Sequence, residues 1–390
     1  MKKFLFACAF ICSGLGLFGQ NYEIQALSYR RNFARANLNT KYELVKDASK
    51  IATKEGASFF LSALTFVDSV YELLEDDNTL MQIGIVSVET LARLKVDEAV
   101  LPIRLLFIRV KDVAFEEACV RAFKAFDLSD EDLVKDLNLK FEKLFYKSVS
   151  GQAYSKQLLF AYIDSLGALG NKQTFSLLFD ALIKSSDDEI KNNCKTALSK
   201  IPVNFFDELV KIIERKELYS TSVAFETALE SSSVSENELA EITDMSMSVA
   251  LDSLNTQKVL SKRILDKALK LLTEKRWQGA TDLVVSYFYK VQASYRAGIA
   301  SDSDLVAVID CMAVLSSKEC ANALVIFLGL LNSDAERGKP YSENLVFATI
   351  KALGELGDSN AFDYLVYVDY LNYPERIKKL ARESIAKLRW

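Results

Sequence analysis

The sequence predicts an all-α protein, a solenoid of stacked helix pairs. Half of the 390 residues are hydrophobic, which is enough to build a large core. Only 14 glycines and 4 prolines are present, fewer than a protein with many strands and tight turns would need. Apolar residues recur at spacings of three, four and seven positions along most of the chain, a periodicity typical of amphipathic helices.

The first 19 residues resemble a bacterial secretory signal peptide. Two lysines precede an apolar run over residues 4–18, which is shorter than the roughly 20 residues of a membrane-spanning helix. We therefore expect cleavage near Gly19 and export to the periplasm. The alternatives are an uncleaved anchor and a lipoprotein modified at Cys8 or Cys12, and the sequence favours them less.

The net charge argues against nucleic acid as a partner. The chain carries 48 basic and 53 acidic residues, a net charge of −5, and loss of the two lysines in the signal peptide would make it −7. Nucleic-acid-binding domains usually carry an excess of basic residues gathered on one face. No second apolar run is long enough to cross a membrane, so no transmembrane span is expected in the exported chain.

The clearest internal repeat joins two segments that lie 187 residues apart, "LFAYIDSLGALGN" (159–171) and "LVFATIKALGELGD" (345–358). Aligned without a gap, they match leucine with leucine and glycine with glycine at four positions, and the apolar register continues downstream. Two further copies lie upstream, and within a full copy the leucine pair returns after 32 residues. A unit of about this length with two amphipathic helices is typical of a helical solenoid.

The turn between the two helices of a unit also has its own signals. Gly170 and Gly357 end the first helix of the two clearest copies, and we expect left-handed C-caps there. Asp358 and Asn360 follow and are suited to the N-terminus of the next helix.

The repeat resembles the short HEAT-like repeats of the phycobilisome-lyase type. The residues that carry the likeness are "ALGELGDSNAFDYL" (352–365) followed by "ERIKKLARESIAKL" (375–388). The resemblance implies a right-handed α-solenoid, an α-α superhelix in which the second helix of each pair lines the concave face. Lyases of this family act on bilins, but nothing in this sequence beyond the repeat points to that activity.

The repeat divides the chain into five segments. The likeness is clear over residues 80–201 and 305–390, the second of which ends in a capping helix. Residues 1–19 are the signal peptide, and 20–79 are expected to form an N-terminal helical cap. Residues 202–304 stay helical in pattern but lose the leucine-glycine signature, so they are either degenerate repeats or an inserted helical bundle.

Tyrosines recur every third residue in "FDYLVYVDYLNYPER", residues 362–376. At 100° per residue, Tyr364 falls at the edge of the core stripe, and we predict that it is buried. Tyr367 and Tyr370 point away from that stripe, near Asp363, and these three residues are the candidate partner-binding site. The alternative, which the sequence favours, is that both tyrosines pack on a neighbouring repeat or on the C-terminal helix.

The last of these tyrosines has a different setting. Tyr373 precedes Pro374, which disfavours a helix at the residue before it, so Tyr373 is predicted to lie in a turn.

Composition removes most catalytic chemistry. The chain has no histidine, which excludes Ser-His-Asp and Cys-His catalysis and histidine metal sites, including those of the HEAT-like iron enzymes. None of the four cysteines beyond the signal peptide forms a C-x-x-C motif, and we expect them to be small buried core residues. Cys311 and Cys320 flank one helix-helix turn, and a disulfide between them is the alternative. No catalytic residue, cofactor or metal ligand is predicted.

Four short acidic clusters lie between helical segments, and helix-starting roles account for them. They are "LLEDD" (73–77), "SDED" (129–132), "SSDDE" (185–189) and "SDSD" (301–304). Asp302 and Asp304 have the spacing of calcium ligands, but the segment lacks the glycine and the late glutamate of an EF-hand loop.

Two basic stretches are candidate contacts for an acidic partner or for lipid headgroups at a membrane surface. The candidate residues are Arg30, Arg31 and Arg35 near the N-terminus and Arg376, Lys379 and Arg382 in the last helix. The alternative, which we favour, is that the end units of a solenoid need a polar outer face.

The sequence therefore predicts a non-catalytic binding or scaffold protein of the bacterial cell envelope, with proteins as partners. The alternative is an enzyme or an enzyme accessory subunit that acts on an envelope component, with its site in residues 202–304. Self-assembly into a structural protein is a third interpretation.

Overall fold

The computed structural model describes residues 27–75, 77–127 and 130–389, and these residues form helices joined by turns and short loops, which confirms the all-α prediction. The predicted signal peptide lies outside the described residues. The described part contains no β-strand; an isolated bridge joins Asp358 to Arg389. None of its helices combines the length and the apolar character that crossing a bilayer requires.

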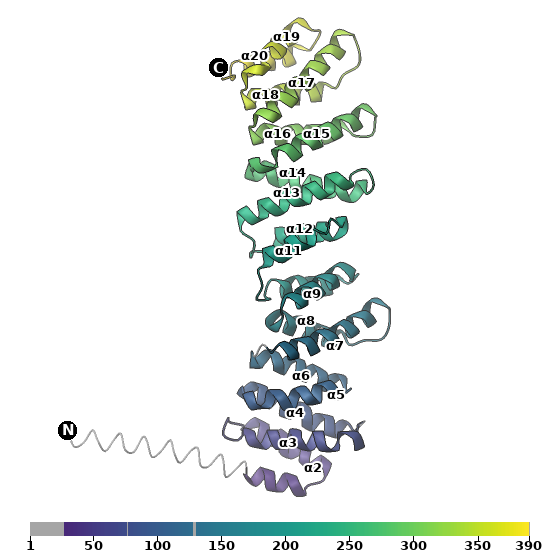
Figure 1. Ribbon diagram of the computed structural model, residues 1–390, viewed down its shortest axis with the longest axis vertical. Helices are drawn as coiled ribbons and strands as arrows, with labels where there is room; N and C mark the ends of the chain where they lie inside the picture. The colour runs from purple at the N-terminus through teal and green to yellow at the C-terminus, as the bar shows by residue number, and fades with distance from the viewer. Residues whose placement is uncertain (1–26, 76, 128–129, 390) are drawn as a thin grey trace, which may run out of the picture. The chain divides into compact units, whose positions relative to one another are not determined.

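The chain forms two compact units, which meet in sequence at residues 204 and 205. Unit 1 starts with a helical segment over residues 27–35. Its remaining α-helices, shown in purple to teal in Figure 1, are α2 (Leu38–Lys50), α3 (Ala57–Val70), α4 (Asn78–Leu94), α5 (Val100–Arg109), α6 (Val113–Phe126), α7 (Glu131–Val149), α8 (Lys156–Leu169), α9 (Lys172–Lys184) and α10 (Asp188–Leu198). Its short 3₁₀ turns are η1 (Tyr71–Leu73) and η2 (Asp97–Ala99).

Unit 2 continues the succession of helices. They are α11 (Phe205–Ile213), α12 (Leu218–Glu230), α13 (Glu236–Ser253), α14 (Lys258–Lys275), α15 (Thr281–Arg296), α16 (Asp302–Leu315), α17 (Lys318–Glu336), α18 (Glu343–Leu356), α19 (Phe362–Tyr367) and α20 (Glu375–Ile385). Its 3₁₀ turns are η3 (Gln278–Ala280), η4 (Ser359–Ala361) and η5 (Val368–Tyr370).

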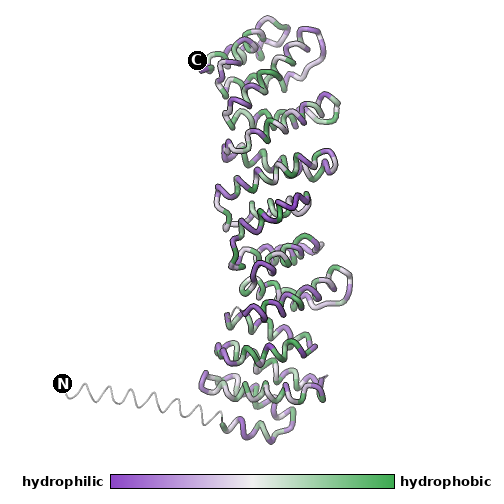
Figure 2. The backbone as a smooth tube through the Cα atoms, viewed as in Figure 1, coloured by the Kyte–Doolittle hydropathy of each residue, from purple (hydrophilic) through white to green (hydrophobic). Residues whose placement is uncertain are grey.

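Each unit has two layers, because a helix packs on the next helix and also on the next but one. In unit 1 the even layer runs α2, α4, α6, α8, α10, and the odd layer pairs α3 with α5 and α7 with α9. In unit 2 the even layer runs from α12 to α20 and the odd layer from α11 to α19. The core lies between the layers, and Figure 2 shows apolar residues recurring along the helices.

Residues 202–304, which lack the leucine-glycine signature, show the same packing, in which a helix contacts the next helix and the next but one. Its helices α11 to α15 make alternate contacts, α11 with α13, α12 with α14 and α13 with α15. These contacts continue from α14 to α16 and from α15 to α17. Residues 205–296 therefore share the layered architecture of the helices that follow them.

The repeat register places equivalent residues in equivalent surroundings. Leu166 and Leu353 are both fully buried, as are Leu178 and Leu365. Gly167 and Gly354 lie where two helices of the even layer cross: a Cβ on Gly354 would come within 2.5 Å of the Ser384 side chain on α20. The glycine of the repeat therefore permits close helix packing.

The acidic clusters start helices, as predicted. Asp77, Asp130 and Asp187 are the N-caps of α4, α7 and α10, and each accepts hydrogen bonds from backbone N–H groups of the first turn. Ser301 and Asp304 form a reciprocal capping box at α16.

The two repeat glycines at the end of the first helix differ from each other. Gly357 has φ +69° and ends α18 in the predicted left-handed conformation, and Asp358 then caps η4. The same prediction for Gly170 is wrong, because its backbone is extended (φ −68°, ψ 168°). Gly170 instead avoids a collision, since a Cβ there would lie 2.3 Å from the Leu166 carbonyl oxygen.

Candidate functional site

The tyrosine segment forms the outward side of the odd layer at α19 and η5. Tyr367 is 40% exposed and Tyr370 is 79% exposed, and Asp363 is exposed beside them. The α-helix ends at Tyr367 and tightens into the 3₁₀ turn η5, after which Leu371 is extended. The candidate partner-binding residues are therefore all at the surface of unit 2.

The prediction that Tyr364 is buried is wrong, because its side chain is 40% exposed. Its ring lies over Gly329 of α17, where a Cβ would come within 2.9 Å of the ring atom Cε1. Asn332 of α17 donates a hydrogen bond of 3.1 Å to the Tyr364 carbonyl oxygen and holds the two helices together. The ring thus covers a glycine at the surface of α17 rather than entering the core.

Two aliphatic side chains of α17, the helix that carries Gly329, are also exposed. Ile326 is 54% exposed and Leu330 is 36% exposed, one turn apart on either side of Gly329 in sequence. We call these two residues with Tyr364, Tyr367 and Tyr370 the aromatic face. Ile326 and Leu330 were not predicted from the sequence as binding residues, although their i, i+4 spacing in a helix that already has a buried stripe is a detectable signal.

Acidic groups border the aromatic face. The Tyr367 hydroxyl donates a hydrogen bond of 2.9 Å to Glu336 Oε1, and this bond to a carboxylate raises the pKa of Tyr367. The bond also limits the rotation of the ring. With Glu336 and the exposed Asp363 at its edge, the face combines aromatic surface with negative charge.

Tyr373 lies in the turn before α20, as predicted, and is 4% exposed. Its ring meets Tyr341 edge to face at 5.0 Å, and its hydroxyl donates to Asn332 Oδ1 at 3.3 Å. This tyrosine is a packing residue.

The N-terminal basic candidates are partly engaged. The Arg30 guanidinium donates to Ser62 Oγ on α3, whereas Arg31 and Arg35 are exposed. The nearby Lys41 is 7% exposed; its ammonium group donates to the carbonyl oxygens of Phe33 and Ala36, and burial lowers its pKa.

The C-terminal basic candidates form ion pairs inside unit 2. Arg376 pairs with Glu343, and Lys379 lies 4.0 Å from Glu383. Arg382 bonds Asp369 at 2.9 Å and Glu375 at 3.0 Å. These exposed pairs contribute little to stability individually. They nevertheless reduce the positive charge that α20 presents to a partner.

The four cysteines of the described residues are free thiols, fully buried, as expected of core residues. Burial raises the pKa of Cys194 to about 12 and that of Cys311 to about 11, and it also raises the pKa of Cys119 and Cys320. A buried thiol with a raised pKa is a poor nucleophile.

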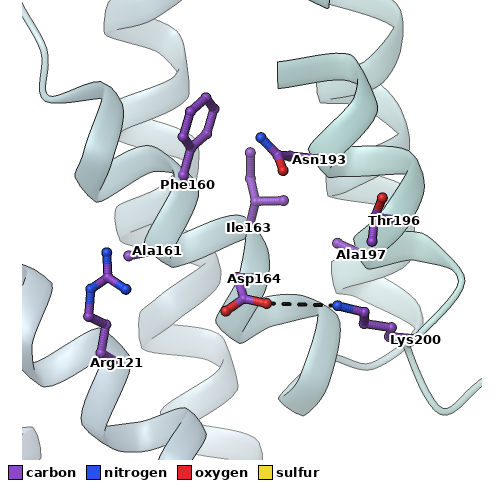
Figure 3. Close-up of a pocket in the computed structure, with 9 residues that line it drawn as sticks. All are labelled: Arg121, Phe160, Ala161, Ile163, Asp164, Asn193, Thr196, Ala197 and Lys200. Carbon is purple, nitrogen blue, oxygen red and sulfur yellow. Dashed lines mark ion pairs between the residues drawn. The ribbon is translucent and has the colours of Figure 1, made fainter. Parts of the chain in front are cut away.

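Each unit contains a pocket whose lining bears on ligand binding. The first, of about 240 Å³, opens on the even layer of unit 1 between α6, α8 and α10. Figure 3 shows Asp164 at its edge pointing toward Lys200, at 3.9 Å, and Asp164 also pairs with Lys124 at 2.5 Å. Its main charges thus neutralise each other, and its volume is below the roughly 300 Å³ at which ligand pockets usually begin.

The second pocket, of about 430 Å³, lies in unit 2 between the end of α13, the start of α14, α15 and the start of α16. Among the described residues, Asp304 is the one carboxylate that lines it, and its partner Lys262 lies 2.5 Å away. Burial opposes ionisation of Asp304, but hydrogen bonds from Lys262 and Ser301 outweigh this effect and lower its pKa to about 2. Asp304 is therefore unsuited to proton transfer near neutral pH.

Comparisons with known proteins give no family for this chain. No protein-family model matches it, and no curated protein matches it. One solved structure that aligns with it is the crystal structure of an engineered protein from the Northeast Structural Genomics Consortium. That alignment covers 93% of this chain and 98% of the other at 14% identity, with a TM-score of 0.36, which is too low to support an argument about fold or function.

Proposed function

We propose that this chain is a non-catalytic binding or scaffold protein of the bacterial cell envelope that holds protein partners on its helical-repeat surface. The proposal includes export by a cleaved signal peptide and membership of the HEAT-like repeats, with the right-handed coiling that this implies. The observation that carries the binding function is the aromatic face of α17, α19 and η5.

The composition of the aromatic face supports a protein partner. Three exposed tyrosines and two aliphatic side chains provide contact area, and tyrosine loses little conformational entropy when it is held in an interface. The bond between Tyr367 and Glu336 orders one ring in advance. Because Asp363 and Glu336 border the face, the fitting partner presents apolar side chains together with arginine or lysine.

The alternative function is an enzyme or accessory subunit with a site in residues 202–304, and the 430 Å³ pocket is the observation that favours it. Catalysis there would need a group that transfers a proton or attacks a substrate. The carboxylate that lines the pocket is held by Lys262, so binding is the better supported role.

Photo-crosslinking in intact cells tests the binding function. A photo-reactive residue would replace Tyr367 or Tyr370, and the control would carry it at Lys351, which is exposed on α18 in the even layer of the same unit. We expect discrete adducts from both tyrosine positions and none from Lys351, and mass spectrometry would identify the partner.

A binding measurement completes the test. Once a partner is identified, the double variant Tyr367→Ala/Tyr370→Ala should weaken its binding by about tenfold or more, as for interface anchors. Adducts of equal strength at Lys351, or none at either tyrosine, would contradict the proposal. An adduct of twice the chain's own mass would instead identify the partner as a second copy of this protein.

A further inference from the structure

The pocket of unit 2 is lined by a combination of groups that the binding surface above does not use. Three lysines line it, Lys258 and Lys262 from α14 and Lys290 from α15. Lys262 is paired with Asp304, but Lys258 and Lys290 form no ion pair with any described residue. Both of these lysines are exposed at the pocket, and they leave its lining with more positive than negative charge, although Asp266 lies near Lys262 and Tyr287. This excess of positive charge favours an anion.

A tyrosine hydroxyl that makes no hydrogen bond within the described part of the chain lines the same pocket. Tyr287 of α15 is 4% exposed, and its hydroxyl makes no hydrogen bond within the described part of the chain. The rest of the Tyr287 side chain is buried, but its hydroxyl oxygen is accessible from the pocket and can donate a hydrogen bond to a ligand there. The phenol is a donor to an anionic oxygen, because burial raises the pKa of Tyr287 and keeps it protonated.

The remaining wall of the pocket is largely apolar. Leu254, Val291 and Ile299 line it together with Ala293 and Ala300. Ile299 lies in the loop between α15 and α16 and is 63% exposed, so apolar surface extends to the outside of the pocket. The volume of about 430 Å³ is within the range of small-molecule sites.

We propose that this pocket binds a single-chain amphiphilic anion, whose carboxylate or phosphate is recognised by Lys258, Lys290 and the Tyr287 hydroxyl while its alkyl chain packs on Leu254, Val291 and Ile299. Two unpaired ammonium groups and a phenol match a headgroup with two or three oxygens. This site does not depend on the aromatic face or on a protein partner.

Isothermal titration calorimetry of the chain starting at residue 20 tests the site. The probe is octanoate below its micelle-forming concentration, compared with octan-1-ol, which lacks the charge, and acetate, which lacks the chain. We expect octanoate to bind about tenfold or more tightly than either of the other two, because each of them loses one of the two kinds of contact.

Surface variants connect the binding to the pocket. Lys290→Gln and Lys258→Gln should each weaken the binding of octanoate about tenfold. The control Lys270→Gln removes the same charge from an exposed position of α14 outside the pocket, and it should not change this binding. Ile299→Ser should weaken it about threefold or more, and Val259→Ser, at an exposed position that does not line the pocket, should not. Tyr287→Phe removes only the hydroxyl and should also weaken it.

Several results would overturn the proposal, and two others would identify the source of the ligand. Absence of octanoate binding, equal binding of octan-1-ol or acetate, or an equal loss with Lys270→Gln would each overturn it. Octanoate binding without co-sedimentation with phosphatidylglycerol vesicles would identify a free amphiphile as the ligand. Co-sedimentation that Lys290→Gln abolishes would identify the same headgroup chemistry in a bilayer lipid.

Discussion

At the scale of single residues, Asp244 of α13 has surroundings that disfavour a charge. Its Oδ1 atom is buried and has no hydrogen-bond partner within the described part of the chain. Its Oδ2 atom faces Gly279, where a Cβ would come within 3.3 Å. Burial, with a smaller contribution from Glu241, raises the pKa of Asp244 to about 6.

The raised pKa predicts a specific pH dependence of stability. An aspartate in the unfolded chain loses its proton near pH 4, but Asp244 in the folded protein keeps its proton up to about pH 6. The native state therefore binds more protons between these values, and the contribution of Asp244 to the free energy of unfolding falls as the pH rises from 4 to 6. We expect Asp244→Asn to stabilise the protein by roughly 1 kcal/mol at pH 7 and to have no such effect at pH 4.

Urea denaturation of both proteins at pH 4 and pH 7 measures this difference. The control is Asp252→Asn, which changes an exposed carboxylate on the same helix. A stabilisation of the Asp244 variant that is the same at both pH values would contradict a role for its charge.

The cysteines predict a second residue-scale result. In a chain starting at residue 20, we expect a thiol-specific reagent at pH 8 to react at least about a hundredfold more slowly with the folded protein than with the urea-unfolded protein. The reason is that all four thiols are fully buried and burial raises their pKa values. Spectrophotometric counting of released thiolate checks this, and rapid reaction of one equivalent in the folded state would show that a cysteine is accessible.

At the scale of helices, the repeat glycine controls how closely the even layer packs. Gly354 faces Ser384, and the Ser384 hydroxyl donates to the Ile350 carbonyl oxygen at 3.1 Å, so the crossing of α18 and α20 combines a close approach with a buried hydrogen bond. Gly167 faces Ala197 in the same way at the crossing of α8 and α10. A Cβ on Gly167 would lie 2.9 Å from the Ala197 Cα.

Substitution of this glycine should therefore separate the helices. We expect Gly354→Ala to lower the free energy of unfolding by about 1–3 kcal/mol, although alanine favours helix more than glycine does, because the added methyl group overpacks the crossing. The control is Glu355→Ala, at the neighbouring exposed position of α18. If Gly354→Ala were neutral or stabilising in thermal denaturation, helix propensity would outweigh packing at this crossing.

At the scale of the whole molecule, the two compact units predict that each can fold by itself. Within each unit the main contacts of a helix are with helices close to it in sequence, so the stabilising contacts are largely local. We expect fragments 20–204 and 205–390 each to show helical circular dichroism and a cooperative thermal transition. Non-cooperative melting of either fragment would show that its stability depends on the rest of the chain.

Composition and apolar spacing were enough to predict the helical class, leucine and glycine spacing predicted the repeat, and the acidic clusters predicted helix starts. These features depend on neighbours within a few residues or on one recurring contact, which is why Asp187 and Ser301 cap helices as expected. The prediction for Gly170 failed because glycine also permits an extended backbone, and the prediction for Tyr364 failed because burial needs a second helix. Periodicity gives the direction of a side chain on its own helix, but burial depends on what the facing helix supplies, and the Tyr364 ring lies over Gly329 of α17, which has no side chain to cover it.

Each candidate site likewise has features that the sequence predicts and features that depend on tertiary packing. The sequence by itself determined that Tyr367 and Tyr370 point away from the core stripe, because 100° per residue is a property of one helix. Only the tertiary structure brought Ile326 and Leu330 to the aromatic face and gathered Lys258, Tyr287, Lys290 and Ile299 around one pocket. The residues of each site come from more than one helix or loop, and their proximity follows from the packing of these elements rather than from any pattern within one of them.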